Sequence, residues 1–490
     1  MRHWFPAFLL FAVAPLAADV DPDKNLLAGW SVLDARAVAL LRDAGFRAVL
    51  VPFPGEDDTI SFARACREGG LVPVAEIGGV TDEAALRTGI DSAAAAGFAG
   101  VAFDALASEQ ATQSVAGARK DLVSFVFLKP EQVHWRVEPA RAVLREGRWP
   151  GMQPPDPSVA SATESYWVDA NSFVAGWLRG VHPERAALLG YRPDENAGVS
   201  KHRMIHFDSL ELVLADAFAG GGNAILYFPE IHQKAILEGK QQALETWRSL
   251  ADTARFLKEH LPVFRSPAAS RVAVAAGTFE QSGELLNMLY RRNVSPAVFP
   301  AASLPEWQPG RSRVLVAANI ATPSEAGRRR ALDLARSGGQ VMAAPAADND
   351  PKWWRDPAAR VERKEEEREI HALGSGRVFG YAGPIIDPAE FALDVIDALG
   401  MRTRDLRIWG ADTVIGVLGA GRGGRTSVIL VNYGHLLDEY EFLIRVEGAF
   451  SKAILREPGG APSPLRVAAR GSGTEINIDH LRRLALIDLE

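Results

Sequence analysis

The chain has 490 residues, more than one hydrophobic core commonly serves, and this length predicts about three domains. Its composition, 47% hydrophobic and 23% charged, is that of a globular protein and excludes wholesale disorder. The net charge of -7 and the lack of a long basic tract argue against nucleic acid as the main partner, because phosphate binding needs a concentrated basic face. A neutral or weakly charged ligand is the better expectation.

Residues 1–18 are expected to be a secretory signal peptide. They combine a basic start, an apolar stretch and small residues at Ala17 and Ala18, where cleavage would occur. The alternative is a buried N-terminal helix, which Pro6 and Pro15 disfavour. No later segment reaches the roughly 18 uninterrupted apolar residues that a membrane span requires. We therefore expect an exported protein, periplasmic or secreted, without a membrane span.

Residues 19–265 are predicted to form a (β/α)8 barrel. Four apolar segments, at 28–32, 47–53, 71–77 and 99–105, alternate with helical patterns, which is typical of a parallel sheet. The second half of the barrel is less regular, and its strands are expected at 124–129, around 148–152, at 186–192 and at 223–229. A helix over 241–260 would then cover the last strand, with Trp247 in the core.

Residues 268–402 predict a small doubly wound α/β domain, because short apolar strands again alternate with amphipathic helices. The charged segment from 351 to 376 is interpreted as a surface excursion, with Lys364 to Arg368 on a solvated helix face. From residue 403 onward, short strands recur with turn residues between them, the pattern of a β-sandwich. The expected fold is α/β: a TIM barrel, a doubly wound domain and a C-terminal all-β sandwich.

Three acids follow predicted barrel strands and are the candidate catalytic residues. Asp104 closes AGVAFDAL, Glu230 closes NAILYFPE, and Glu76 ends the third strand. The carboxyl ends of parallel barrel strands open on one face, so acids placed there converge on one cleft. Two carboxylates across a cleft are the minimum equipment for cleaving a glycosidic bond. Each acid could instead cap a helix or form an ion pair at the rim.

An aromatic and polar segment, SATESYWVDANSF at 161–173, indicates carbohydrate binding. Sugars present flat C–H faces and many hydroxyls, which aromatic rings and Asp or Asn side chains recognise. A helix start capped by Asp169, with Trp167 in the core, is an equally good interpretation. The expected substrate-binding residues are Trp30, Trp167, Asp169, Asn171, Tyr191 and Asp194.

No motif in the chain predicts a metal ion or a cofactor. His202 and His206 have metal-ligand spacing, but no third ligand follows with supporting spacing. The glycine motif at 419–424 matches a dinucleotide fingerprint but precedes a strand, so no helix N-terminus would receive a pyrophosphate. Cys66, the only cysteine, is expected to be a small buried side chain, and no disulfide can form within the chain.

The layout resembles secreted bacterial glycoside hydrolase-like proteins, in which a TIM barrel precedes a glutamine-amidotransferase-like domain and a β-sandwich. The segments that carry the resemblance are AGVAFDAL, EGRWPGMQPP, SATESYWVDAN, NAILYFPE, SGRVFGYAG, PAEFALDVI, SVILVNYG and TEINIDHLRRLALIDL. The domain order is similar to that of family-42-type β-galactosidases, whose middle domain mediates trimerisation. The amidotransferase chemistry itself is excluded, because it needs a cysteine and none follows residue 66.

The resemblance implies a carbohydrate substrate and assembly into homo-oligomers through the middle domain. One departure concerns the fourth strand: it ends in Phe103-Asp104, where family-42 enzymes carry an Asn-Glu pair, and so looks more like an α-galactosidase or dextranase barrel. The expected function is a glycoside hydrolase that uses a pair of carboxylates. The alternative is a non-catalytic carbohydrate-binding or scaffold protein that retains the barrel.

Overall fold

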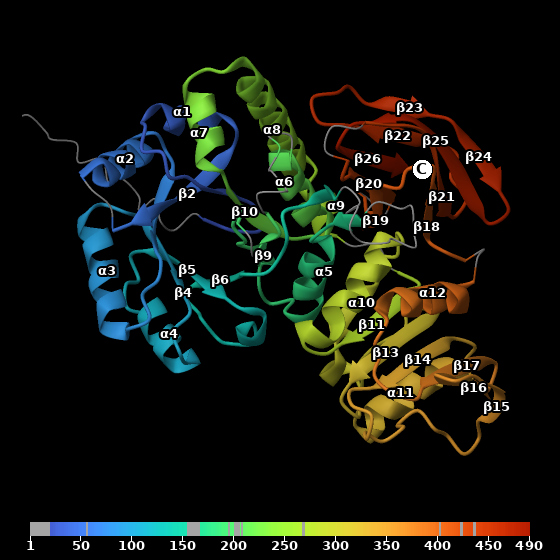
Figure 1. Cartoon of the computed structure of the whole chain (residues 1–490). Helices are drawn as coiled ribbons and strands as arrows, with labels where there is room; N and C mark the ends of the chain where they lie inside the picture. The colour runs from blue at the N-terminus through green and yellow to red at the C-terminus, as the bar shows by residue number, and fades with distance from the viewer. Residues whose placement is uncertain are drawn as a thin grey trace, which may run out of the picture.

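The computed structural model describes residues 20–54, 57–153, 167–194, 197–199, 206, 209–266, 270–400, 403–421, 425–434 and 438–490. Figure 1 shows three units: a barrel at the left, a mixed sheet with helices at the lower right, and two β-sheets at the upper right. The expected fold class is confirmed. The predicted signal peptide lies outside the described residues.

The first unit is a closed barrel of eight strands, each parallel to both of its neighbours, in the order β1-β10-β9-β6-β5-β4-β3-β2. The strands are β1 Leu26–Gly29, β2 Phe46–Phe53, β3 Val72–Ile77, β4 Gly100–Asp104, β5 Val123–Leu128, β6 Arg141–Leu144, β9 Leu188–Leu189 and β10 Asn223–Tyr227. The helices of this unit are α1 Arg36–Asp43, α2 Asp57–Glu68, α3 Glu83–Ala95, α4 Glu109–Ala116, α5 Ser172–Val181, α6 Ser209–Ala219, α7 Glu230–Leu237, α8 Gln241–Glu259 and α9 Leu261–Arg265.

The sixth barrel strand lies earlier than the sequence predicted. Strand β6 ends at Leu144, whereas the expected segment around 148–152 contributes to β7, Gly151–Gln153. That strand pairs antiparallel with β8, Trp167–Asp169, in a separate sheet of two strands. The prediction was wrong because β6 has only four residues, and the aromatic RWPGM segment beside it gave a stronger apolar pattern.

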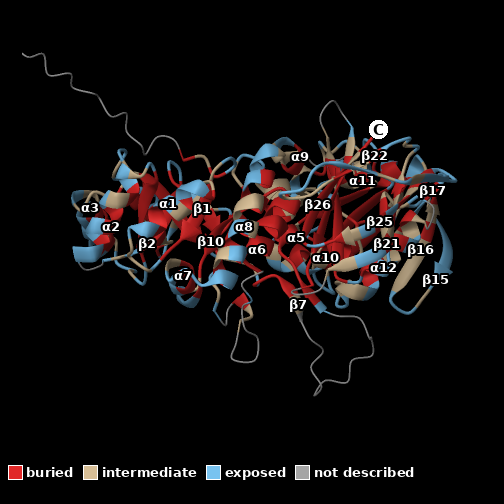
Figure 2. Cartoon of the chain, turned by 90° about the horizontal axis from the view of Figure 1, so that it is seen from above, coloured by how far each residue is buried: buried red, intermediate tan, exposed pale blue. Residues whose placement is uncertain are grey.

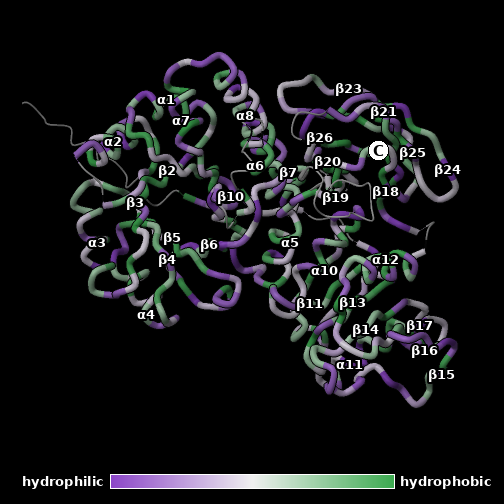
Figure 3. The backbone as a smooth tube through the Cα atoms, viewed as in Figure 1, coloured by the Kyte–Doolittle hydropathy of each residue, from purple (hydrophilic) through white to green (hydrophobic). Residues whose placement is uncertain are grey.

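Alternate residues of the strands fill the barrel interior, as the two-residue repeat of a strand requires. This inner cluster includes Leu27, Leu50, Val74, Ala102, Phe125, Phe127, Val143, Leu188 and Ile225, all buried. Figure 3 shows the hydrophobic colour along β4 and β5. The barrel is therefore a packed core, and a ligand can enter only above it, at the mouth formed by the strands' carboxyl ends.

The second unit is a seven-stranded sheet in the order β12-β11-β13-β14-β17-β16-β15. Its elements are β11 Val272–Ala276, α10 Phe279–Arg291, β12 Ala297–Pro300, β13 Val314–Ile320, α11 Glu325–Arg336, β14 Gln340–Pro345, β15 Arg360–Lys364, β16 Arg368–Leu373, β17 Gly376–Tyr381 and α12 Pro388–Leu399. The first five strands in that order pair in parallel. Buried residues of α10 and α12 pack on one face and those of α11 on the other, so the sheet is doubly wound.

The charged segment of this sheet forms strands, not the solvated helix face expected around Lys364 to Arg368. Strands β15 and β16 pair antiparallel, and all five residues of β15 are exposed at the edge of the sheet. Charged side chains suit an edge strand because they oppose pairing with another chain.

The third unit consists of two antiparallel sheets, ordered β18-β21-β25-β24 and β19-β20-β26-β22-β23. The strands are β18 Leu406–Trp409, β19 Val414–Ala420, β20 Thr426–Asn432, β21 Glu439–Glu447, β22 Ala453–Arg456, β23 Ser463–Leu465, β24 Val467–Arg470, β25 Gly473–Leu481 and β26 Leu484–Leu489. A buried cluster that includes Leu430, Phe442, Ile444 and Ile476 joins the two sheets. Strands β19 and β20 pair antiparallel, and residues 422–424 of the glycine motif between them lie outside the described residues.

Helix α6 joins the barrel to the third unit. All of its residues are buried, and it contacts both β10 and β20, which explains its mainly apolar sequence. Figure 2 shows α6 and α5 as a buried zone between the units. Within α6, the carboxylate of Asp216 accepts hydrogen bonds from the Asn171 and Ser172 backbone nitrogens and from the Tyr433 hydroxyl at 2.6 Å.

Candidate active site

Charged side chains at the barrel mouth continue the two-residue alternation of the inward-facing residues along the strands. Along β3, the interior residues Val72 and Val74 lead two residues further to Glu76, and along β4 Ala102 leads to Asp104. The same step from Val143 leads beyond the end of β6 to Arg145, and two such steps from Leu188 lead beyond the end of β9 to Arg192. We define the mouth layer as Glu76, Asp104, Phe127, Arg145, Arg192 and Tyr227.

Arg145 links the two acids of the mouth layer. Its Nε donates to Asp104 Oδ1 at 3.1 Å, and its Nη2 lies 3.7 Å from Glu76 Oε1. The guanidinium also lies over the Phe127 ring, 3.9 Å from the ring centroid, which fixes its plane. The Arg145 guanidinium therefore lies between the carboxylates of Asp104 and Glu76.

The environments of the two acids differ. Glu76 has only 6% of its side chain exposed, and it also accepts hydrogen bonds from Arg192 and from the Tyr227 hydroxyl at 3.0 Å. Burial, together with the nearby Glu76 carboxylate, raises the pKa of Tyr227 well above its usual value, so the phenol stays protonated and donates. Asp104 is 46% exposed, and its Oδ2 accepts no hydrogen bond from the described residues. Asp104 is therefore the carboxylate available to a ligand.

A pocket of about 360 Å³ opens beside the mouth layer. Its lining combines aromatic rings with polar groups, the combination that suits a sugar. It includes Trp30, Phe53, Glu76, Arg192, Tyr227 and Gln233. Gln233 is held rigidly, because its Oε1 accepts from the Val32 backbone nitrogen at 2.7 Å and its Nε2 donates to the Phe228 carbonyl at 2.6 Å.

Gly29, at the end of β1, makes room for the Tyr227 ring. A Cβ at this position would lie 2.1 Å from Tyr227 Cδ1, so any side chain must displace the ring. We expect Gly29→Ala to lower the free energy of unfolding by about 1–3 kcal/mol, because over-packing forces the ring and strand apart. Gly78→Ala is the matched control: it lines the same pocket, and a Cβ there meets nothing within 4 Å. Equal stability of the two variants in urea unfolding would contradict this packing.

The third sequence candidate, Glu230, does not belong to this cluster. It lies in the first turn of α7, its side chain is 61% exposed, and it pairs with Lys234 at 2.5 Å. Strand β10 ends at Tyr227, and the chain turns into the helix before Glu230. An exposed carboxylate paired with a lysine lacks the partly buried setting that a proton donor needs.

Trp30 lines the pocket but belongs mainly to the core. Its side chain is 1% exposed, its indole nitrogen donates to the Val32 carbonyl at 2.7 Å, and its ring packs against Phe228 and Trp247. Trp247 is buried, as predicted. A sugar could therefore meet only an edge of Trp30.

Asn171 and Tyr191 are internal supports. The Asn171 amide oxygen accepts from the Arg148 backbone nitrogen at 2.7 Å. Its amide nitrogen donates to the Arg148 carbonyl oxygen at 2.7 Å and to Asp216 at 2.9 Å. Tyr191 is 7% exposed, and its ring packs against Trp149. Both residues hold the segment that follows β6, and Asn171 also lines the second pocket described below.

Trp167 and Asp169 lie at a second pocket of about 510 Å³ between the barrel and α10. The Trp167 indole nitrogen donates to Asp169 Oδ1 at 3.1 Å, and the Arg291 guanidinium covers one face of the ring at 3.8 Å from its centroid. Asp194, the last expected contact, accepts from the Ala197 backbone nitrogen at 3.2 Å.

Two residues of the mouth layer, Arg145 and Arg192, were missed from the sequence, and so was Glu146. Glu146 lies two residues beyond the end of β6 and lines the second pocket. Burial raises the pKa of Glu146 above its usual value. The sequence signal that could have found them is the apolar run from Ala142 to Leu144, which is followed by an arginine and an acid. Placing the sixth strand at 148–152 concealed it.

Among the described residues, no group of three or more His, Cys, Asp or Glu side chains is arranged to hold a metal ion. Of the histidine pair considered from the sequence, His202 lies outside that part of the chain. No described helix is both long and apolar enough to cross a bilayer.

Comparison with known proteins relates the chain to solved structures only, since no family model and no curated protein matches it. The α-L-fucosidase isoenzyme 2 from Paenibacillus thiaminolyticus is similar over 95% of this chain and 99% of its own, with a TM-score of 0.57 and 10% identity. This likeness shows a shared fold.

Two further solved structures match the chain with lower TM-scores. The exo-carrageenase GH42 from Bacteroides ovatus covers 78% of this chain and 54% of its own, with a TM-score of 0.42 and 10% identity. Gan42B, a GH42 β-galactosidase, covers 88% and 66%, with a TM-score of 0.38 and 11% identity.

Proposed function

We propose that the chain is a glycoside hydrolase that binds a saccharide at the barrel mouth and uses Asp104 as the nucleophile or charge-stabilising carboxylate. One observation carries the proposal. Asp104 stands at the carboxyl end of β4 with one carboxylate oxygen fixed by Arg145 and the other open to a ligand. That arrangement orients an anion toward the anomeric carbon, where positive charge develops as the glycosidic bond breaks.

Glu146 is the proton donor in this proposal, in place of Glu230. A donor must hold its proton near neutral pH, and burial raises the pKa of Glu146. Glu146 follows the arginine that fixes Asp104, and it shares its pocket with Trp167 and Asp169. The two acids therefore have different environments: Asp104 is half-exposed beside a guanidinium, and Glu146 is partly buried with a raised pKa.

The proposed reaction follows from these roles. Glu146 gives its proton to the glycosidic oxygen while the bond from that oxygen to the anomeric carbon breaks. Asp104 then either bonds to the anomeric carbon, giving a product of retained configuration, or stabilises the cation while water attacks, giving an inverted one. Tyr227 and Arg192, which line the neighbouring pocket, would contact the sugar.

A carbohydrate-binding protein without hydrolytic activity is the second candidate. It is favoured by the ion network of the mouth layer, in which Arg145 stands between Asp104 and Glu76 and neither acid faces the other across open space. Incubation with a panel of aryl glycosides and polysaccharides separates the two proposals. Release of aglycone or reducing ends supports the enzyme, whereas saturable saccharide binding without products supports the binder.

Glu146→Gln is expected to lower kcat by about 10²- to 10⁴-fold on substrates with poor leaving groups, because the departing oxygen is no longer protonated. The loss should be much smaller on dinitrophenyl glycosides, whose leaving group needs no proton. In the wild type, kcat should fall as the pH rises above the elevated pKa of Glu146, and the variant should lack this limb of the profile.

Glu230→Gln tests whether Glu230, rather than Glu146, is the proton donor. Glu230 pairs with Lys234 on an exposed helix, so its amide variant should keep the wild-type pH profile. A profile that changes in Glu230→Gln and not in Glu146→Gln would overturn the donor assignment.

A further inference from the structure

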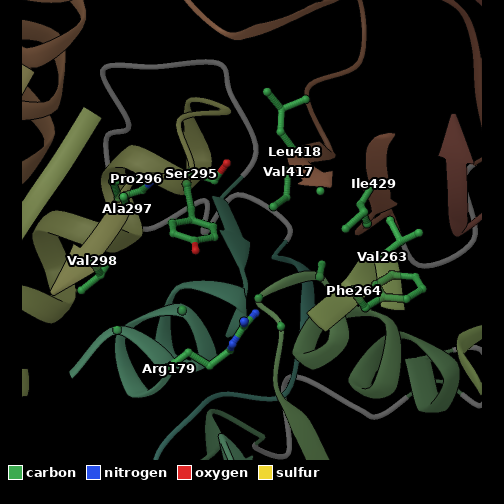
Figure 4. Close-up of a pocket in the computed structure, with 17 residues that line it drawn as sticks. Arg179, Val263, Phe264, Ser295, Pro296, Ala297, Val298, Val417, Leu418 and Ile429 are labelled. Carbon is green, nitrogen blue, oxygen red and sulfur yellow. The ribbon is translucent and has the colours of Figure 1, made fainter. Parts of the chain in front are cut away.

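A second cavity, remote from the barrel mouth, lies where the three units meet. Its volume is about 200 Å³, and its wall draws on α5 and α9 of the first unit, on α10 and β12 of the second, and on β19 and β20 of the third. Figure 4 shows this pocket with the Arg179 side chain directed toward its centre from below and Val417, Leu418 and Ile429 on the opposite side.

Arg179 is a cation without a carboxylate partner. Its Nη2 donates to the Arg265 carbonyl oxygen at 2.7 Å, and within the described ranges no acid lies at ion-pair distance from it. The Arg179 side chain is partly buried, and this burial lowers its pKa from the usual value, although the charge of Asp23 opposes the shift. A partly buried guanidinium without an ion-pair partner is suited to bind an anion.

A second guanidinium adds to the positive charge. Arg265 donates to the Gly221 and Gly222 carbonyl oxygens at 2.6 and 2.5 Å, and its nearest acid, the half-exposed Asp23, lies 4.0 Å away. Burial lowers the pKa of Arg265 to about 10, and Arg179 contributes to this shift by like-charge repulsion. The two guanidinium groups therefore lie in one partly buried region, and among the described residues Asp23 is at ion-pair distance from Arg265 but not from Arg179.

Neutral donors complete the wall opposite Arg179. Tyr290 and Ser295 both line the cavity, and in the described part of the chain neither hydroxyl has a hydrogen-bond partner. Burial raises the pKa of Tyr290 to about 12, so its phenol remains a donor at neutral pH. The space depends on glycine: a Cβ at Gly176 would lie 2.3 Å from the Tyr290 hydroxyl.

We propose that this cavity binds a small oxyanion, such as phosphate, sulfate or a carboxylate, between the Arg179 guanidinium and the hydroxyls of Tyr290 and Ser295. A planar guanidinium offers paired N–H groups that match two oxygens of such an anion. The remaining oxygens would accept from the two hydroxyls. Since Arg179 belongs to the barrel unit and the hydroxyls belong to the second unit, the bound anion would hold these units together.

Calorimetric titration of the full-length protein with inorganic phosphate and with sodium sulfate, at constant pH and ionic strength, tests the proposal. The expected result is saturable binding of one anion per chain. Thermal unfolding midpoints should rise with anion concentration in the same saturable way, because a ligand that binds only the folded state stabilises it. A rise that continues linearly without saturation is a general salt effect and would count against a site.

Two variants make the test specific. Arg179→Gln should weaken binding about tenfold or more, since it removes the charge, and Tyr290→Phe should weaken it several-fold while it keeps the ring packing. Arg329→Gln, which makes the same charge change at an exposed position of α11, should bind like the wild type.

If the wild type shows no saturable binding, or if Arg179→Gln and Tyr290→Phe both bind like the wild type, the proposal fails. A poorly folded Arg179→Gln leaves Tyr290→Phe to decide. None of these readouts uses glycoside turnover, so the outcome is independent of the function proposed for the barrel mouth.

Discussion

Asp104→Asn is expected to lower kcat on every active glycoside by about 10³-fold or more, with a smaller effect on KM. The amide keeps the size of the side chain but removes the negative charge that Arg145 orients toward the mouth at 3.1 Å. Initial rates measured on the best substrate of the glycoside panel give the comparison. Because the side chain is half-exposed, the variant should fold normally.

Asp121→Asn is the matched control. Asp121 is also an arginine-paired aspartate, bonded to Arg119 at 2.7 Å, but its side chain is 62% exposed and lies outside the mouth layer. It should retain wild-type turnover. If Asp104→Asn hydrolyses as fast as this control, Asp104 has no catalytic role.

Asp216→Asn is expected to weaken the folded state in a pH-dependent manner. Burial raises the pKa of Asp216 from 3.8 to about 6, so the folded state takes up a proton more readily than the unfolded chain. The stabilisation from this proton is complete below pH 3.8 and is lost as the pH rises through 6. The stability margin of the wild type over the variant should therefore be largest near pH 4 and shrink by about 3 kcal/mol by pH 7.

Urea unfolding of both proteins at several pH values between 4 and 7 measures this margin. Asp397→Asn, at an exposed position of α12, is the control and should show a constant difference from the wild type. A margin for Asp216→Asn that grows with pH would mean that the hydrogen bonds from Asn171, Ser172 and Tyr433 outweigh burial.

Strands β2, β3 and β4 could be predicted because they are mainly apolar and buried. Strands β3 and β4 read as apolar runs ending in an acid, so the two-residue repeat sufficed to bring Glu76 and Asp104 to one mouth. The alternation of strands and helices likewise identified the doubly wound sheet, and the dense turns identified the final β-sheets.

The rest of the candidate site depended on short or distant elements. Strand β6 has four residues and β9 has two, too few to show a period, so Arg145, Glu146 and Arg192 were not recognised. Glu230 looked like a strand-end acid, and the structure has the alternative that the sequence also offered, a helix that begins at this residue.

The supporting role of Asn171, an expected sugar contact, required three-dimensional information. Asn171 looked like a sugar ligand, but its amide bonds Asp216, 45 residues away in sequence. Tyr433 bonds the same carboxylate across 217 residues. No local pattern could have indicated either contact.

The most direct test of the central claim is a crystal structure of Asp104→Asn with a saccharide that the wild-type protein binds or hydrolyses. The account predicts a sugar ring at the barrel mouth, with its anomeric carbon beside residue 104 and its hydroxyls within hydrogen-bond distance of Arg192 or Tyr227. Saccharide bound only outside the mouth layer, with the Glu76, Arg145 and Arg192 network closed beneath it and out of contact, would contradict the account.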